Sequence, residues 1–111
     1  MKKIALFALA LSSLLVAPAL AAGGPTAQTS ATKTVSISGF TYKPATLTVA
    51  KGTTVRWVNG DGVAHTATRA GGFNTKRIGA GKSASVRFNA RGSFRYHCTI
   101  HPEMRGKIVV Q

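Results

Sequence analysis

Residues 96–104, with the sequence Tyr-His-Cys-Thr-Ile-His-Pro-Glu-Met, hold most of the side chains of this 111-residue chain that could bind a soft metal ion. Cys98 is the only cysteine, His101 follows three residues later, and Met104 follows after three more. One thiolate and two imidazoles in a trigonal set, with a weak axial thioether, suit a blue-copper electron-transfer centre. This stretch supplies three of those four ligands, and His65 is the candidate for the fourth.

The lone cysteine leaves three alternatives, which are a buried inert thiol, an intermolecular disulfide and a metal thiolate. Only metal coordination also accounts for His101 and Met104. Zinc fits less well because a thioether is a poor zinc ligand, and an iron–sulfur cluster normally needs more thiolates. His97 neighbours Cys98 and should point to the opposite face of its strand, so we leave it out of the predicted ligand set.

The chain begins like an exported protein. Residues 1–21 combine a positive start, a short apolar core and a small-residue site at Ala19-Leu20-Ala21, as in a secretory signal peptide. The alternative, a membrane anchor, is disfavoured because a span needs about 20 apolar residues. We expect cleavage after Ala21, a flexible leader over residues 22–32, and a single domain over residues 33–111.

Apolar and polar residues alternate over most of the predicted domain, which is the period of half-buried strands. The clearest segments are residues 35–37, 47–49, 53–59, 83–88, 93–97 and 107–110, whereas residues 69–82 should be mainly loop. No stretch has a convincing helical pattern. We therefore predict an all-β protein, a sandwich or barrel with about seven or eight strands in two sheets.

The charge is strongly positive. Fifteen Lys and Arg against Asp61 and Glu103 give a net charge of +13. Such a field favours anionic partners, and contact with an anionic membrane surface stays open. Nucleic-acid binding is not expected, because the cations are scattered and no nucleic-acid motif is present. The sequence has no paired carboxylates, and no serine–histidine–acid set can be proposed with only two acids. Four protein ligands would also leave no position on the metal for a substrate, so we do not expect an enzyme.

The sequence Tyr-His-Cys-Thr-Ile-His-Pro-Glu-Met-Arg-Gly-Lys-Ile-Val-Val at 96–110 closely resembles the ligand loop and last strand of small cupredoxins. The two-residue gap between His101 and Met104 is most similar to the amicyanin type, and residues 39–44 and 51–59 resemble the family's early strands. The resemblance implies a Greek-key β-sandwich of eight strands. It also implies one copper ion with His65, Cys98 and His101 as equatorial ligands and Met104 as axial ligand, and a periplasmic one-electron shuttle.

Two residues depart from the family pattern. Thr66 stands where many members have an asparagine that ties the two ligand loops together, so this link should be altered or supplied differently. Glu103 places an acid between His101 and Met104. It could pair with Arg105 or contact a partner, but a solvated surface carboxylate is the simpler interpretation.

Within this interpretation, His101 is the predicted electron port, with Ile100 and Pro102 offering an apolar docking patch around it. The basic surface should steer a redox protein with an acidic docking surface, and we expect a monomer. The main alternative function is a copper chaperone or copper-storage protein. A copper oxidase or nitrite reductase would need additional histidines, and only His97 remains.

Overall fold

The computed structural model describes residues 31–111. The predicted signal peptide and residues 22–30 of the predicted leader lie outside the described residues. Within residues 31–111 every regular element is a strand, and no helix is present that could cross a membrane.

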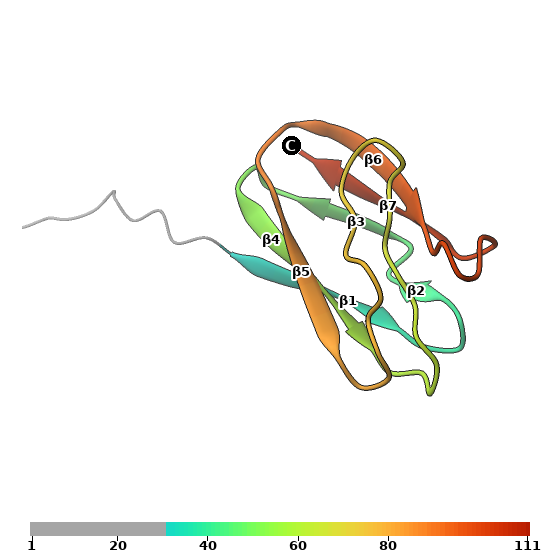
Figure 1. Ribbon diagram of the computed structural model, residues 1–111. Coiled ribbons are helices and arrows are strands. Elements are labelled where there is room, and N and C mark those ends of the chain that lie inside the picture. The colour runs from blue at the N-terminus through green and yellow to red at the C-terminus, as the bar shows by residue number, and fades with distance from the viewer. Residues whose placement is uncertain (1–30) are drawn as a thin grey trace, which may run out of the picture.

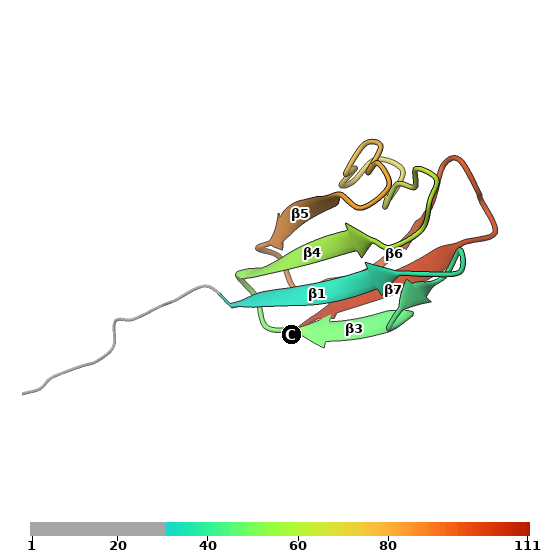
Figure 2. The same cartoon turned by 90° about the horizontal axis from the view of Figure 1, so that it is seen from below.

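Seven strands form two sheets that pack face to face (Figures 1 and 2). The first sheet has the order β2 (Tyr42–Lys43), β1 (Thr32–Ile37), β4 (Thr53–Asn59) and β5 (Ser83–Phe88). The second has the order β3 (Thr46–Val49), β7 (Arg105–Val110) and β6 (Gly92–His97). The predicted all-β sandwich is confirmed, and the number of strands lies at the lower end of the prediction.

Both sheets mix parallel and antiparallel pairs. β1 runs parallel to β4 and β3 parallel to β7, whereas the β1–β2, β4–β5 and β6–β7 pairs are antiparallel. The parallel register pairs Ile37 with Asn59, the last residues of β1 and β4. The turns that follow these two strands therefore leave the sheet side by side, although about twenty residues separate them in the sequence.

The core lies between the sheets and follows the strand alternation. In β4 the side chains of Val55 and Trp57 are buried, whereas Arg56 between them is exposed. The Trp57 indole Nε1 donates a hydrogen bond to the Tyr96 hydroxyl at 3.2 Å, which joins the two sheets in the middle of the core. Gly106 lies opposite Tyr96, and a Cβ there would come within 2.8 Å of the Tyr96 ring. Glycine is required because the ring covers this strand.

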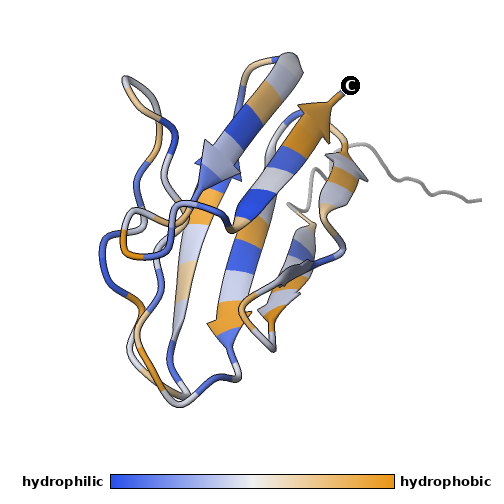
Figure 3. Cartoon of the chain, turned by 90° about the vertical axis from the view of Figure 1, so that its right-hand side faces the viewer, coloured by the Kyte–Doolittle hydropathy of each residue, from blue (hydrophilic) through white to orange (hydrophobic). Residues whose placement is uncertain are grey.

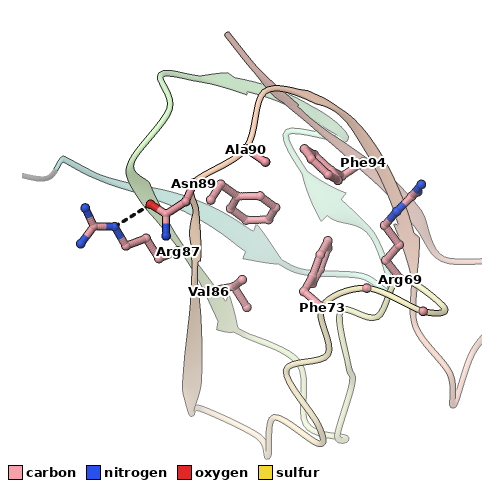
Figure 4. A pocket seen from close by; sticks show the side chains of 10 residues that line it. Arg69, Phe73, Val86, Arg87, Asn89, Ala90 and Phe94 are labelled. Atoms are coloured by element: carbon pink, nitrogen blue, oxygen red, sulfur yellow. Dashed lines mark hydrogen bonds between the residues drawn. The ribbon is translucent and has the colours of Figure 1, made fainter.

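The connection between β4 and β5 is a long loop, as predicted, but short bridges hold it in place. His65 exchanges backbone hydrogen bonds with Ile78, and Thr68 exchanges them with His97 at the end of β6. An open hollow of about 310 Å³ lies between this loop and the segment that runs from β5 through the next turn into β6 (Figure 4). Its apolar walls include Phe73, Phe88 and Phe94, and none of its lining residues is a candidate metal ligand.

Candidate metal centre

The structure brings His65, Cys98 and His101 together at one end of the sandwich, with their ligand atoms within 4.8 Å of one another. The Cys98 Sγ lies 3.9 Å from Nδ1 of His65 and 3.7 Å from Nδ1 of His101, and the two Nδ1 atoms are 3.1 Å apart. Metal–sulfur and metal–nitrogen bonds are about 2.0–2.3 Å long, so one ion can reach all three atoms at these separations. His65, which is 33 positions from Cys98 and 36 from His101 in the chain, thus forms one compact donor set with them.

Met104, the fourth predicted ligand, ends the same loop and is only 2% exposed. The loop is closed by two backbone hydrogen bonds, from Cys98 N to Met104 O at 3.1 Å and from Met104 N to His101 O at 2.9 Å. These bonds make residues 98–104 a tight turn between β6 and β7. The thioether residue is therefore buried at the base of the loop that carries the thiol and one imidazole.

Asn59, the last residue of β4, positions the segment that carries His65. Its buried side-chain amide donates to the carbonyl oxygens of Val63 at 2.8 Å and Ile78 at 2.9 Å. Its Oδ1 accepts a hydrogen bond from the backbone N–H of Asp61 at 2.9 Å. Because Ile78 also pairs with the His65 backbone, one amide group connects the end of the core strand to the backbone of the histidine.

Asp61 determines which nitrogen of His65 faces the cluster. Its Oδ2 lies 2.9 Å from His65 Nε2, and the imidazole is fully buried. An ionised carboxylate can only accept, so Nε2 carries the proton of the hydrogen bond. A neutral imidazole then has its lone pair on Nδ1, the atom that faces Cys98 and His101. Such carboxylate–histidine pairs orient metal ligands and raise their basicity.

The same carboxylate joins the two turns at this end of the sheet. The backbone N–H groups of Gly39 and Phe40 donate to Asp61 at 2.8 and 2.9 Å, and both residues have a left-handed backbone with φ near +60°. The N–H of Phe40, followed by the N–H of Gly39 and the His65 imidazole, lowers the pKa of Asp61 against the opposing effect of desolvation. Asp61 is therefore held ionised, as its pairing with His65 requires.

Thr66 supplies the link between the two ligand segments that the sequence left open. Its backbone N–H donates to Cys98 Sγ at 3.3 Å, and its hydroxyl oxygen accepts a hydrogen bond from the Thr99 N–H at 3.0 Å. The Tyr42 hydroxyl donates to the Thr66 carbonyl oxygen. Burial raises the pKa of Tyr42 far above its usual range, with smaller effects from Cys98 and Tyr96, so this donor stays protonated.

The exposed side of the cluster consists of His101 and an aromatic neighbour. The Phe40 ring meets the rings of His65 and His101 edge-on, with centroids 5.0 and 4.8 Å apart, and remains 45% exposed. Cys98 and His65 are fully buried, whereas His101 is only partly buried. Among the three clustered donors, His101 is the one with access to solvent.

Sequence reasoning missed the contributions of Asp61 and Phe40. Asp61 had a visible signal, because it is one of only two acids and precedes His65 by four residues in a turn-rich segment. Phe40 had none, since its contact with His101 joins residues 61 positions apart. His97 lies outside the cluster, as predicted. Glu103 is exposed and pairs with no cationic side chain among the residues that the structure describes.

The sequence pattern of the cupredoxin-like domain matches residues 4–110 of the chain. The chain belongs to the cupredoxin family. Amicyanin from Paracoccus versutus is 34% identical to this cupredoxin over 83 residues, which cover 69% of this chain and 63% of that protein. Amicyanin-alpha from Methylorubrum extorquens is 31% identical over 114 aligned positions, covering 95% and 96% of the two chains.

Solved structures agree with these sequence matches. A copper(I) form of an amicyanin variant superposes with a TM-score of 0.70 at 30% identity, covering 78% of this chain and 87% of that chain. An oxidised amicyanin variant gives a TM-score of 0.69 at 32% identity, covering 71% and 81%. The predicted resemblance to the amicyanin type of cupredoxin is confirmed.

Proposed function

We propose that this cupredoxin is a periplasmic carrier of single electrons, in which His65, Cys98, His101 and Met104 hold one copper ion. The observation that carries the proposal is the convergence of a buried thiol and two imidazole Nδ1 atoms within 4.8 Å, at the end of a loop that buries a methionine. Thiolate, imidazole and thioether donors in this combination suit blue copper. When bound, copper would supply the one-electron couple between its Cu(I) and Cu(II) states.

The protein's own contribution is a set of donors with little freedom to move. Cys98 accepts a hydrogen bond from the Thr66 N–H, His65 is held by Asp61, and the backbone bonds of residues 98–104 close the loop. Rigid donors limit the rearrangement that accompanies a change of metal charge. The exposure of His101 makes it the proposed route for electrons between the buried site and a partner.

The partner we propose is a redox protein with an acidic docking surface. The net charge of +13, which becomes +11 when Lys2 and Lys3 leave with residues 1–21, would speed the encounter with such a partner and make its rate fall as salt is added. We further propose that the protein is exported with removal of residues 1–21 and that it is a monomer. The periplasmic location of an amicyanin-like carrier would follow from that export.

The optical and paramagnetic-resonance spectra of the copper(II) protein test the site. We expect an intense blue charge-transfer band that disappears on reduction, and its complete loss in Cys98→Ser. His97→Asn is the matched control, because it removes the imidazole next to Cys98 and should leave the band unchanged. A band that survives Cys98→Ser, or that is lost in His97→Asn, would contradict the proposed ligand set.

The same measurement separates electron transfer from copper storage or delivery. A chaperone should bind copper(I) in exchangeable form and show slow electron transfer. Rapid bleaching of the blue band by a small neutral reductant such as hydroquinone, with the copper retained during gel filtration, supports the carrier. Loss of copper to a chelator on the same time scale would instead support storage or delivery.

A further inference from the structure

We propose that the outer face of the second sheet is a docking site for the carboxylate-rich surface of a redox protein. The site consists of Arg69, Arg95, Arg105 and Lys107, which we call the β6–β7 cationic face. The inference rests on the proposed electron-carrier function and adds to it a second contact surface besides the loop around His101. The observations that support it are the strand register, the shape of the surface, the absence of neutralising acids and the connection to Cys98.

The register of β6 and β7 places like charges directly opposite each other. Arg95 pairs with Lys107, and two residues further along His97 pairs with Arg105. Directly opposed side chains lie about 4.5–5.5 Å apart at Cβ, and like charges at that separation are destabilising. Arg69 is drawn to the same place by a hydrogen bond from its guanidinium to the Arg95 carbonyl at 3.0 Å. Folding therefore brings together cations that repel one another.

The first sheet has no such arrangement on its outer face. Arg56 on β4 lies opposite Ser85, and Arg87 on β5 lies opposite Thr54. Each of these arginines faces a small hydroxyl residue across the strand, and Arg56 donates to Ser83 while Arg87 donates to Asn89. The first sheet shows that a cation on one strand can face a neutral residue on the next. The concentration of cations on the second sheet is therefore a property of the β6–β7 pair.

The cationic face carries two shallow, open depressions. One hollow of about 270 Å³ is lined by Arg69, Arg95, His97 and Arg105, and a second of about 220 Å³ by Arg95, Arg105 and Lys107 with Thr46. The two hollows share Arg95 and Arg105, so they adjoin along the strands. Figure 3 shows that β7, the strand that ends at the C-terminus, is hydrophilic in its first half and hydrophobic toward its end. Carboxylates on a partner's surface could reach the cations that border these depressions.

No acid of residues 31–111 neutralises this face. Asp61 is engaged with His65 and with the turn at Gly39, and Glu103 forms no ion pair within the described part of the chain. Arginine forks bind carboxylates through two parallel hydrogen bonds, and three guanidinium groups border the hollows. The missing counter-charges would come from the partner.

The position of the face suits electron transfer. His97 lines the larger hollow, and one peptide bond joins it to Cys98. The backbone of His97 is itself held by two hydrogen bonds with Thr68, both 2.9 Å long. A partner seated on the cationic face would therefore be separated from the Cys98 sulfur by the end of one strand.

The test measures binding of an acidic flavodoxin to the isotope-labelled copper(I) protein by nuclear magnetic resonance at about 0.1 M salt. We expect shifts concentrated on the outward residues of β6 and β7, and association about tenfold weaker for Arg95→Gln/Lys107→Gln. The control Arg56→Gln/Arg87→Gln removes the same charge from the opposite sheet. Sheets pack about 10 Å apart and the Debye length at this salt is about 10 Å, so the control should change association by less than about twofold.

Two further readouts distinguish the possible failures. Arg95→Gln/Lys107→Gln should unfold at the same or a higher urea concentration than the parent protein, because a like-charge pair is relieved, so weaker binding cannot be ascribed to misfolding. Bleaching of the blue band by hydroquinone tests the proposed function separately, and its failure would leave the binding result interpretable. Equal weakening by both double variants, shifts confined to residues 98–104, or binding to phosphatidylglycerol vesicles but not to flavodoxin would each overturn the docking site.

Discussion

Replacement of Asn59 by alanine should destabilise the protein more than any single hydrogen bond could explain. The side chain is fully buried at the end of β4 and holds the segment that carries His65. Alanine removes the amide but leaves the surrounding backbone groups where they are. The carbonyl of Ile78 and the N–H of Asp61 then lose a partner in a region with little access to water.

The expected size of the effect follows from the bonds. Two amide hydrogens serve the carbonyl oxygens of Val63 and Ile78, and a longer contact of 3.3 Å reaches Gly79. Oδ1 accepts one further bond, so about three hydrogen bonds are lost. At about 1 kcal/mol each, and somewhat more for the groups left buried, the free energy of unfolding should fall by about 3–4 kcal/mol.

Urea unfolding of the metal-free protein, followed by Trp57 fluorescence, measures this loss without any assumption about copper. The midpoint should fall while the slope of the free energy against urea stays constant, because the unfolded chain exposes the same surface. Asn89→Ala is the matched control. Asn89 is exposed and its only side-chain bond is to Arg87, so its loss should cost less than about 0.5 kcal/mol.

A loss below about 1 kcal/mol for Asn59→Ala, or one equal to that of Asn89→Ala, would refute the reasoning. It would mean that water or a rearranged loop forms the hydrogen bonds that the Asn59 side chain had made to the backbone, at little cost in free energy. The role assigned to Asn59 in positioning His65 would then have to be abandoned.

Two other substitutions test the packing and the metal site. Gly106→Ala should lower the free energy of unfolding by about 1–3 kcal/mol, because its methyl group would overlap the Tyr96 ring. The control Gly62→Ala should be nearly neutral, because no atom lies within 4 Å of the added Cβ. Equal urea midpoints for the two variants would contradict the overlap. Asp61→Ala should weaken copper binding about 10- to 100-fold in a chelator competition, because it frees the His65 imidazole. Glu103→Ala removes the same charge but no hydrogen bond to His65, so an equal loss of affinity in that variant would show that charge alone matters.

The local pattern of the sequence was sufficient for the class of fold and for the proximity of Cys98 and His101. Alternation such as that of Val55, Arg56 and Trp57 depends only on the two-residue period of a strand, so the strands and their buried faces could be predicted. The spacing of Cys98, His101 and Met104 likewise acts within one short loop. The burial of Cys98 and Met104 agrees with this expectation.

Contacts between distant segments could not be obtained in this way. The partner of Asp61 in the turn at Phe40 is 21 residues away, and it lies there because β1 and β4 run parallel and end together. The replacement of the expected asparagine by Thr66 is compensated through Thr99, 33 residues along the chain. Both arrangements depend on how whole strands pack, which no local window of sequence contains.

By itself, the sequence determined that this is an all-β chain of high positive charge with a soft donor set beside its last strand. Only the tertiary structure decided that His65 joins that set through Nδ1, and that Arg95 meets Lys107 on one face of the second sheet. The physical reason is that alternation determines the face to which a strand residue points, whereas pairing register determines which residue of the next strand it meets.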